Sequence, residues 1–420
     1  MYKTTPKQAF FSLVTSIISS LSMAHFQRLV YIGDVPVEST FAGSALLFRL
    51  LESWPSDALR IIEGDHLLSR PERRLKNVRY AALPVGWPRP LHTRFAQWYS
   101  AWLSWSAAHR ARHLAPLLGG FEPKAVLTVT HSFSWLTAAV FAGQLGVPLH
   151  IICHDDWPRV GHVPPWGKSW LDRQFGHVYR AAASRLCVSP FMRDSYRIRY
   201  GRDGTVLYPS RAANCPEYDA PPERLSRNDH PFTVAFGGTI NSPGYMRALK
   251  ALRTVLEVLG GRLLVFGPLT TEAAQQNDLA GPNIVLCGLV TSGELMARFR
   301  EEVDVLYVPM SFDSADRANM EAGFPSKLTD YTAVGLPLVI HGPDYCSAVR
   351  WARENCGVAE VVETENPEAL SKALQRLAES PRDRILFGKR ALDVGRRYFA
   401  AESVQRVFHN ALVLKPSQTG

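Results

Sequence analysis

The segment GFPSKLTDYTAVGLPLV, residues 323–339, carries the strongest structural signal in the C-terminal half of the chain. A Gly and a Pro come first, a polar and apolar segment follows, and Gly335 precedes an apolar run. This order predicts a helix of two to three turns after Pro325, a left-handed backbone at Gly335 and a buried strand over 338–340. A helix followed by a buried strand is part of a βαβ unit, so the stretch indicates a parallel sheet.

The first turn of this predicted helix offers groups that suit a phosphate. A helix N-terminus presents free backbone N–H groups and a partial positive charge. Ser326 adds a hydroxyl there and Lys327 adds a cation, while Asp330, three residues later, is expected on the same helix face. The stretch therefore predicts either a site for a diphosphate and sugar hydroxyls, or an ordinary capped helix with an intrahelical ion pair.

Short apolar runs alternate with amphipathic stretches on both sides of a Pro-rich polar segment, which predicts two βαβ arrays joined by a linker. The last long helix, 383–414, is expected to be interrupted near Gly395. The expected parts are an extension (1–27), an N-terminal Rossmann-like domain (28–210), the linker (211–231), a C-terminal Rossmann-like domain (232–395), and a C-terminal helix and tail (396–420). Packing of this last part on the N-terminal domain stays an open alternative.

Charge and tryptophan are unevenly divided between the two halves. Residues 1–220 hold 25 Lys and Arg against 15 Asp and Glu, and nine of the ten Trp; residues 221–420 hold 22 against 23. A basic, Trp-rich half suits a nucleic acid, an anionic membrane surface or an anionic small molecule, or is a solubilising face. Trp98, Trp102 and Trp105 have i, i+4, i+7 spacing and predict one buried helical stripe.

The start of the chain and the cysteines indicate in which cellular compartment the protein is expected. Residues 1–27 carry two lysines and a short, hydroxyl-rich apolar run that is too short for a confident membrane span. We expect a disordered or interfacial extension, with a secretory signal as the open alternative. Six widely spaced cysteines without a Cys-x-x-Cys pair argue against a zinc site or a disulfide scaffold, and they suit a reducing compartment.

Candidate ligand-binding residues lie in loops that follow strands, because a parallel sheet binds ligands at the carboxyl ends of its strands. The chain lacks G-x-G-x-x-G after its first strand and lacks the P-loop motif, which disfavours nicotinamide and P-loop enzymes. Glycines directly after a strand allow a phosphate to approach the backbone. The candidates from this placement are Gly43, His131, His154, Asp155, Asp156, Gly238, Thr239, Gly288 and Leu289.

The stretch around Lys327 closely resembles the donor-site signature of GT-B glycosyltransferases, especially the family 4-like group with its Phe-Pro-Ser-Lys-Leu…Glu-Tyr…Gly-x-Pro pattern. The resemblance implies an α/β protein of the GT-B fold, with two Rossmann-like domains whose parallel sheets face each other across a cleft. It implies that the helix N-terminus, with Ser326 and Lys327, receives the donor diphosphate and that Asp330 contacts the ribose. Asp330 stands where Glu is usual. An upstream Glu of the family is replaced by Ala322, which leaves Glu321 as the candidate substitute.

The same resemblance assigns roles in other loops. Gly238 and Thr239 face the donor diphosphate, although the Arg and Lys that usually follow them in the family are missing here. Gly288 and Leu289 line the nucleotide base. His154 resembles a strand-end histidine that lies against the donor sugar.

Asp155 and Asp156 either orient His154 or bind acceptor hydroxyls; we expect His154, Asp155 and Glu321 to be catalytic and Asp156 to lie on the acceptor side. His131, at the end of the preceding strand, is a second candidate for the strand-end histidine and is expected on the acceptor side. Gly43 lies where the family has a glycine-rich loop near the acceptor.

The implied activity is transfer of a sugar from a nucleoside-diphosphate sugar to an acceptor hydroxyl. The resemblance implies a retaining mechanism with no metal and no cofactor beyond the co-substrate. The expected acceptor is a glycan or a lipid-linked molecule of surface polysaccharide or glycolipid synthesis. We expect a cytoplasmic protein that does not bind nucleic acid, with a peripheral position on the inner face of the membrane left open. A sugar-nucleotide 2-epimerase of the same fold and a catalytically inactive scaffold are the alternatives.

Overall fold

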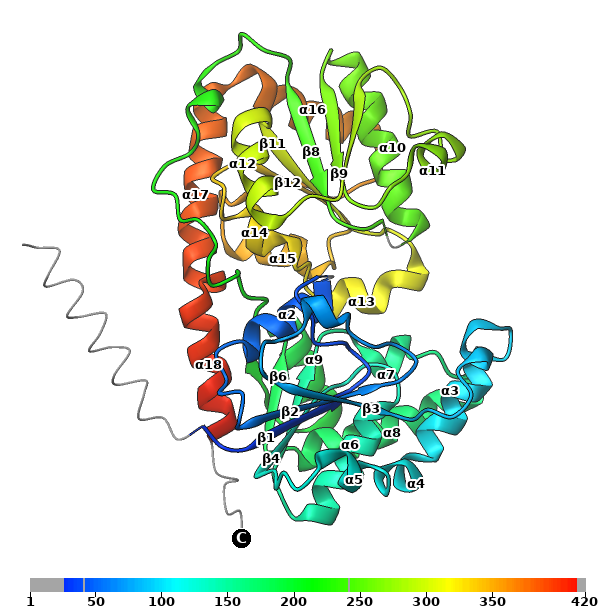
Figure 1. The fold of residues 1–420 in the computed structure, drawn as a ribbon. Helices are drawn as coiled ribbons and strands as arrows, with labels where there is room; N and C mark the ends of the chain where they lie inside the picture. The colour runs from blue at the N-terminus through cyan, green and yellow to red at the C-terminus, as the bar shows by residue number, and fades with distance from the viewer. Residues whose placement is uncertain (1–25, 41, 241, 414–420) are drawn as a thin grey trace, which may run out of the picture.

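The computed structural model describes residues 26–40, 42–240 and 242–413, so the expectations for residues 1–25 lie outside the described part. The chain forms two α/β domains, one above the other in Figure 1, each built on a sheet of parallel strands. The N-terminal sheet contains β1 (Leu29–Gly33), β2 (Leu59–Gly64), β3 (Arg79–Leu83), β4 (Ala125–Val129), β5 (Leu149–Cys153), β6 (Ser184–Cys187) and β7 (Thr205–Val206). The C-terminal sheet contains β8 (Thr233–Gly237), β9 (Arg262–Phe266), β10 (Ile284–Gly288), β11 (Val305–Pro309), β12 (Leu338–His341) and β13 (Ala359–Val362).

Helices connect successive strands in both domains. In the N-terminal domain they are α2 (Ala42–Leu51), α3 (Ala96–Trp105), α4 (Ala107–Ala111), α5 (Leu114–Leu118), α6 (Ser134–Leu145), α7 (Trp157–Val160), α8 (Pro165–Ala181) and α9 (Pro190–Tyr200), with 3-10 turns η1 (Pro71–Arg73) and η2 (Arg89–His92). In the C-terminal part they are η3 (Glu223–Ser226), α10 (Pro243–Val258), α11 (Thr271–Gln276), α12 (Ser292–Glu302), η4 (Ser314–Asp316), α13 (Arg317–Ala322), α14 (Lys327–Tyr331), α15 (Ser347–Glu354), α16 (Pro367–Glu379), α17 (Pro381–Phe399) and α18 (Ala401–Val413).

The strand orders are those of doubly wound sheets. The N-terminal order is β3-β2-β1-β4-β5-β6-β7, and the C-terminal order is β10-β9-β8-β11-β12-β13. In each sheet the winding direction reverses once, between β1 and β4 and between β8 and β11. Ligands bind at such reversal points, outside the carboxyl ends of the strands. The predicted fold class, α/β with two Rossmann-like domains, is confirmed.

Apolar strands explain why both sheets are covered on both faces. Successive residues of β1 alternate between two cores: Val30 and Ile32 pack into one, and Leu29 and Tyr31 pack into the other. Strands buried on both faces read as continuous apolar runs, which is the signal present in the sequence. The C-terminal sheet has the same two-sided burial.

The C-terminal helix belongs to the core of the N-terminal domain. Val404 and Phe408 of α18 pack with Leu29, Leu50 and Trp54. The predicted interruption of the last long helix is present, but it falls between α17 and α18 at Ala400, whose ψ of 132° is not helical, and not at Gly395. Gly395 lies inside α17, where a Cβ atom would collide with Arg211 and Thr332. Close packing, and not a helix end, requires that glycine.

The predicted buried stripe of Trp98, Trp102 and Trp105 is also wrong. These three side chains are between 50% and 58% exposed, and the buried residues of α3 are Ala101, Leu103 and Ser104. Helical spacing identifies a shared face, but it does not say whether that face meets the core or the solvent.

The linker 211–231 is held against the C-terminal domain. Leu225 of η3 is fully buried in the core of that domain, and the Arg384 guanidinium donates to the carbonyl oxygens of Leu225 and Arg227. None of the described helices combines the length and the apolar character that crossing a bilayer requires.

Candidate functional site

The reversal point of the C-terminal sheet is lined by glycines. Gly238 follows β8 with a φ of 130°, and Gly267 follows β9 with a φ of 150°. A Cβ atom on Gly267 would collide with the carbonyl oxygen of Gly238, so the two loops touch backbone to backbone. Gly238 and Thr239 are both exposed at the carboxyl end of β8. Such an exposed glycine backbone allows a phosphate to come close.

Lys327 points to the same loop. Its Nζ lies 4.1 Å from the centroid of the Phe236 ring and 5.7 Å from that of Tyr245. A Cβ atom on Gly238 would be 3.7 Å from this Nζ. Burial lowers the pKa of Lys327 to about 7, because a desolvated ammonium is disfavoured and no carboxylate among the described residues pairs with it. The loop thus faces a cation that a bound anion would stabilise.

The helix around Lys327 is shorter than predicted, with α14 covering only Lys327–Tyr331. Ser326 precedes it with helical backbone angles, and Gly335 has the predicted left-handed backbone, with a φ of 74°. The intrahelical ion pair that the spacing allowed is not formed. Asp330 Oδ1 instead lies 3.9 Å from Nη1 of Arg49, a residue of α2 in the other domain. Burial raises the pKa of Asp330, and Arg49 opposes this shift.

Tyr331 fixes the glycine loop to α14. Its hydroxyl accepts a hydrogen bond from the Gly237 amide at 2.6 Å and lies 3.2 Å from the Gly237 carbonyl oxygen. The Tyr331 ring is buried against Phe299. Glycine loop and lysine are therefore positioned as one unit.

The turn after β10 lies beside this unit. Gly288 has a φ of 68°, and its carbonyl oxygen accepts a hydrogen bond from the Gly267 amide at 2.9 Å. Leu289 is 77% exposed. An exposed apolar side chain next to a glycine turn can cover one face of a flat ring.

In the N-terminal domain, His154 follows β5 and lies next to Gly43 of α2. A Cβ atom on Gly43 would be 4.0 Å from Nδ1 of His154, and one on Gly323 would be 3.9 Å from the His154 carbonyl oxygen. Nε2 of His154 is buried and has no hydrogen-bond partner in the described structure. Burial lowers the pKa of His154 to about 4, so the ring is neutral near pH 7. Residues from both domains thus meet at a histidine with a free ring nitrogen.

His131 and Asp155 form a second pair at the same edge of the sheet. His131 Nδ1 lies 3.4 Å from Asp155 Oδ2, and the His131 ring packs on Trp157 with centroids 4.5 Å apart. Burial raises the pKa of Asp155, but the hydrogen bond and charge of His131, together with the charge of His154, outweigh this effect, and the net shift is downward. Both side chains remain partly exposed, so a ligand can reach them.

Asp156 is engaged by side chains of α9. Its side chain is fully buried, and Arg199 Nη1 donates to its two oxygens at 2.8 and 3.0 Å. Tyr196 adds a hydrogen bond at 3.2 Å. This carboxylate holds α9 against the loop after β5, and the expected contact of Asp156 with an acceptor hydroxyl finds no support in its position.

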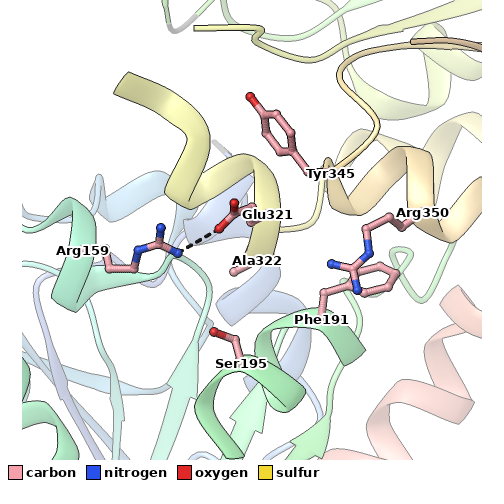
Figure 2. Close-up of a pocket in the computed structure, with 7 residues that line it drawn as sticks. All are labelled: Arg159, Phe191, Ser195, Glu321, Ala322, Tyr345 and Arg350. Atoms are coloured by element: carbon pink, nitrogen blue, oxygen red, sulfur yellow. Dashed lines mark hydrogen bonds and ion pairs between the residues drawn. The ribbon is translucent and has the colours of Figure 1, made fainter. Parts of the chain in front are cut away.

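Glu321 lines a pocket between the domains, shown in Figure 2. The pocket has a volume of about 300 Å³ and is lined by Arg159, Phe191, Ser195, Glu321, Ala322, Tyr345 and Arg350. Glu321 accepts hydrogen bonds from Arg159 at 3.0 Å and from Arg317 at 2.7 Å. Burial raises the pKa of Glu321, but these two arginines lower it by more. The carboxylate is therefore ionised and already paired on both sides.

Sequence reasoning missed the residues that come from distant parts of the chain. Arg49, which meets Asp330, and Arg350, which lies 3.9 Å over the Phe191 ring, carry no local signal. Tyr331 could have been found, because it lies inside the segment 323–339 that predicts the helix and strand. No three His, Cys, Asp or Glu side chains in the described part of the chain gather closely enough to hold a metal ion.

No protein-family model matches the chain, and no curated protein matches it. Solved structures match it over nearly its whole length. HepE from Anabaena, solved with UDP and glucose, is 12% identical, with a TM-score of 0.62 over 92% of this chain and 99% of HepE. The sucrose-phosphate synthase of Thermosynechococcus elongatus is 14% identical, with a TM-score of 0.64 over 92% and 98% of the two chains.

WaaG, a glycosyltransferase involved in lipopolysaccharide biosynthesis, is 14% identical, with a TM-score of 0.59 over 90% of this chain and 99% of WaaG. At these identities the likeness shows the fold: this chain has the two-domain GT-B architecture of these glycosyltransferases.

Proposed function

We propose that this chain transfers a sugar from a nucleoside-diphosphate sugar to an acceptor hydroxyl. The observation that carries the proposal is Lys327, a desolvated cation without a carboxylate partner in the described structure, which faces the Gly238 loop where the C-terminal sheet reverses. HepE, which shares the fold, was solved with UDP-glucose and with UDP. A diphosphate bound between Lys327 and the glycine loop accounts for the lysine without a carboxylate partner and for the exposed backbone at Gly238.

Each part of the donor has a place in this proposal. Lys327, Ser326 and the exposed backbone at Gly238 and Thr239 hold the diphosphate. Asp330 meets the ribose hydroxyls. The turn at Gly288 and Leu289 covers the base.

The transferred sugar then points to His154, whose neutral ring has a nitrogen without a hydrogen-bond partner among the described residues. Charge that develops on the leaving diphosphate is stabilised by Lys327, an electrostatic role that requires no metal ion. We propose a retaining hexosyl transfer in which domain closure excludes water.

The acceptor enters from the N-terminal side in this proposal. Gly43 lies against His154, and the His131–Asp155 pair is partly exposed at the same edge. An acceptor hydroxyl at this edge would lie near the donor sugar. We propose a glycan or lipid-linked acceptor of surface polysaccharide or glycolipid synthesis, used by a cytoplasmic protein at the inner face of the membrane.

A thermal-shift panel with UDP-, GDP-, ADP- and TDP-sugars tests the donor. A sugar nucleotide at a hundred times its dissociation constant stabilises the folded state by about 2.7 kcal/mol. At the same concentration Lys327→Met should lower this stabilisation to between about 1.4 and 0.4 kcal/mol, whereas Lys372→Met, at an exposed lysine on α16, should leave it unchanged. The proposal is wrong if no sugar nucleotide stabilises the protein.

An inactive scaffold is the second candidate, favoured by Ala322 and by the pairing of Glu321 with two arginines. Acceptor-dependent release of nucleoside diphosphate separates the two, because a scaffold that binds the donor releases none. A 2-epimerase would instead interconvert the donor sugar and keep the nucleotide attached.

A further inference from the structure

The N-terminal domain carries a surface of exposed aromatic side chains, here named the tryptophan patch. All the exposed Trp and Phe side chains of the described residues belong to it, and each is between 50% and 64% exposed. The patch consists of Trp87, Phe95, Trp98, Trp102, Trp105 and Trp166. Exposed apolar surface concentrated in one region is unusual for a soluble protein and marks a site of interaction.

Contacts between rings of α3 and α8 hold the tryptophan patch in a defined arrangement. Trp166 of α8 contacts Trp98 and Trp105 of α3, with ring centroids 5.4 and 5.3 Å apart. The Tyr99 hydroxyl donates to the Val85 carbonyl at 2.9 Å, which ties α3 to the preceding loop. Figure 1 shows α3 at the side of the N-terminal domain opposite α18. The rings stay exposed because α3 packs inward through small and aliphatic residues instead.

The charge around the patch is positive. Residues 84–121 contain four Arg and three His but neither Asp nor Glu, and residues 157–171 also lack both acids. Arg89, Arg94 and Arg112 are exposed. Tryptophan rings settle at the headgroup level of a bilayer, because they combine a large apolar body with one N–H group. Arginines beside them are attracted to anionic headgroups.

We propose that the tryptophan patch docks the N-terminal domain on an anionic phospholipid surface. A second copy of this chain fits less well, because two cationic patches facing each other would repel. The proposed function already places the protein at the inner face of the membrane, and this inference deepens it by naming the surface that docks there. Its evidence is the geometry of α3 and α8 and the charges beside them, and not the donor site.

Docking would bring one edge of the candidate site to the lipid. Trp166 is in α8, which follows α7, and α7 begins with the Trp157 ring that packs on His131. The His131–Asp155 pair is thus joined to the docking surface by one short helix. A lipid-linked acceptor would reach this edge without leaving the membrane.

Flotation of the full chain with phospholipid vesicles tests the aromatic contribution. We expect binding to vesicles with about a third phosphatidylglycerol, together with a blue shift of tryptophan fluorescence and quenching by brominated lipid. The triple change Trp98→Ser, Trp102→Ser and Trp166→Ser should lower vesicle binding at least tenfold. The control pair Ile198→Ser and Val258→Ser, at exposed aliphatic positions outside the patch, should not lower it.

The charge contribution needs its own variants. Arg89→Glu, Arg94→Glu and Arg112→Glu together should weaken binding by about fivefold or more for each charge removed, and added salt should weaken the unmodified protein. The control Arg382→Glu with Lys389→Glu, at exposed positions on α17, should have little effect.

Four outcomes would overturn the proposal. In two of them the unmodified protein fails to bind phosphatidylglycerol vesicles, or binds pure phosphatidylcholine equally well. In the third, the patch variants bind the vesicles as well as the unmodified protein does. In the fourth, the patch variants lose self-association or glycan binding while they keep vesicle binding. The donor thermal shift, measured on the same variants, distinguishes failure of docking from failure of the donor site or of folding.

Discussion

The ammonium group of Lys327 lies between the Phe236 and Tyr245 rings, with a pKa lowered by burial to about 7. A bound diphosphate would raise this pKa. Above pH 7 the free protein must then take up a proton when it binds the donor, so the dissociation constant should rise with pH by up to about tenfold per unit. Below pH 7 the lysine is already charged, and the constant should be flat.

Isothermal titration from about pH 6 to about pH 9, in buffers of different ionisation enthalpy, measures both the affinity and the proton uptake. Lys327→Met should bind the donor about tenfold to a hundredfold more weakly and without this pH dependence. A pH dependence that persists in Lys327→Met would assign the titration to another group.

His154 carries a different prediction. His154→Ala should lower the rate of sugar transfer about a hundredfold and leave the donor thermal shift in place, because the ring would contact the sugar in the transition state. Burial lowers its pKa to about 4, so protonation of this ring should not reduce the rate until the pH approaches that value. The matched control is His162→Ala, at an exposed histidine nearby. Equal rates in both variants would remove His154 from the site.

Among the helices, α17 gives a test of close packing. Gly395→Ala would normally stabilise a helix by about 1 kcal/mol, but here the new methyl group meets Arg211 and Thr332. We expect a net loss of about 1 to 3 kcal/mol in the free energy of unfolding, measured by urea denaturation. Gly143→Ala in α6 is the control, because in the described part of the chain its added Cβ meets nothing within 4 Å apart from its chain neighbours and the backbone of its own helix, and it should be neutral or stabilising. A stabilised Gly395→Ala would show that this packing is loose.

The elements also show what the sequence could predict. Strands were predictable because residues buried on both faces of a sheet form apolar runs, as in 29–32. The glycine loop at Gly238 and the left-handed Gly335 followed from local rules. The exposure of the tryptophan patch did not follow from local rules, because the helical spacing of residues is the same on a face that meets the core and on one that meets the solvent. The structural ion pair of Asp156 with Arg199 could not be predicted, because Arg199 lies 43 residues further along the chain.

At the scale of the whole molecule, α18 joins the end of the chain to the first strand. Phe408→Ala should cost about 3 to 5 kcal/mol of stability, because Phe408 is fully buried beside Trp54 and Leu29. Val413→Ala, at an exposed position of the same helix, should change stability by no more than about 0.5 kcal/mol.

Hydrogen exchange should locate the loss in Phe408→Ala. We expect amides of β1 and β2 to lose protection, while those of β8 and β9 keep it. Loss of protection confined to the C-terminal sheet would contradict the packing of α18 on the N-terminal domain.

The position of α18 also bears on synthesis. Domains generally fold from the N-terminus while the chain is still emerging from the ribosome. Here one face of the first domain to emerge stays uncovered until Val404 and Phe408 follow the entire second domain out of the exit tunnel. Through most of translation this face exposes apolar side chains, which makes the nascent chain a substrate for chaperones that shield such surfaces. We therefore expect a chain that ends after the second domain but before α18 to be prone to aggregation.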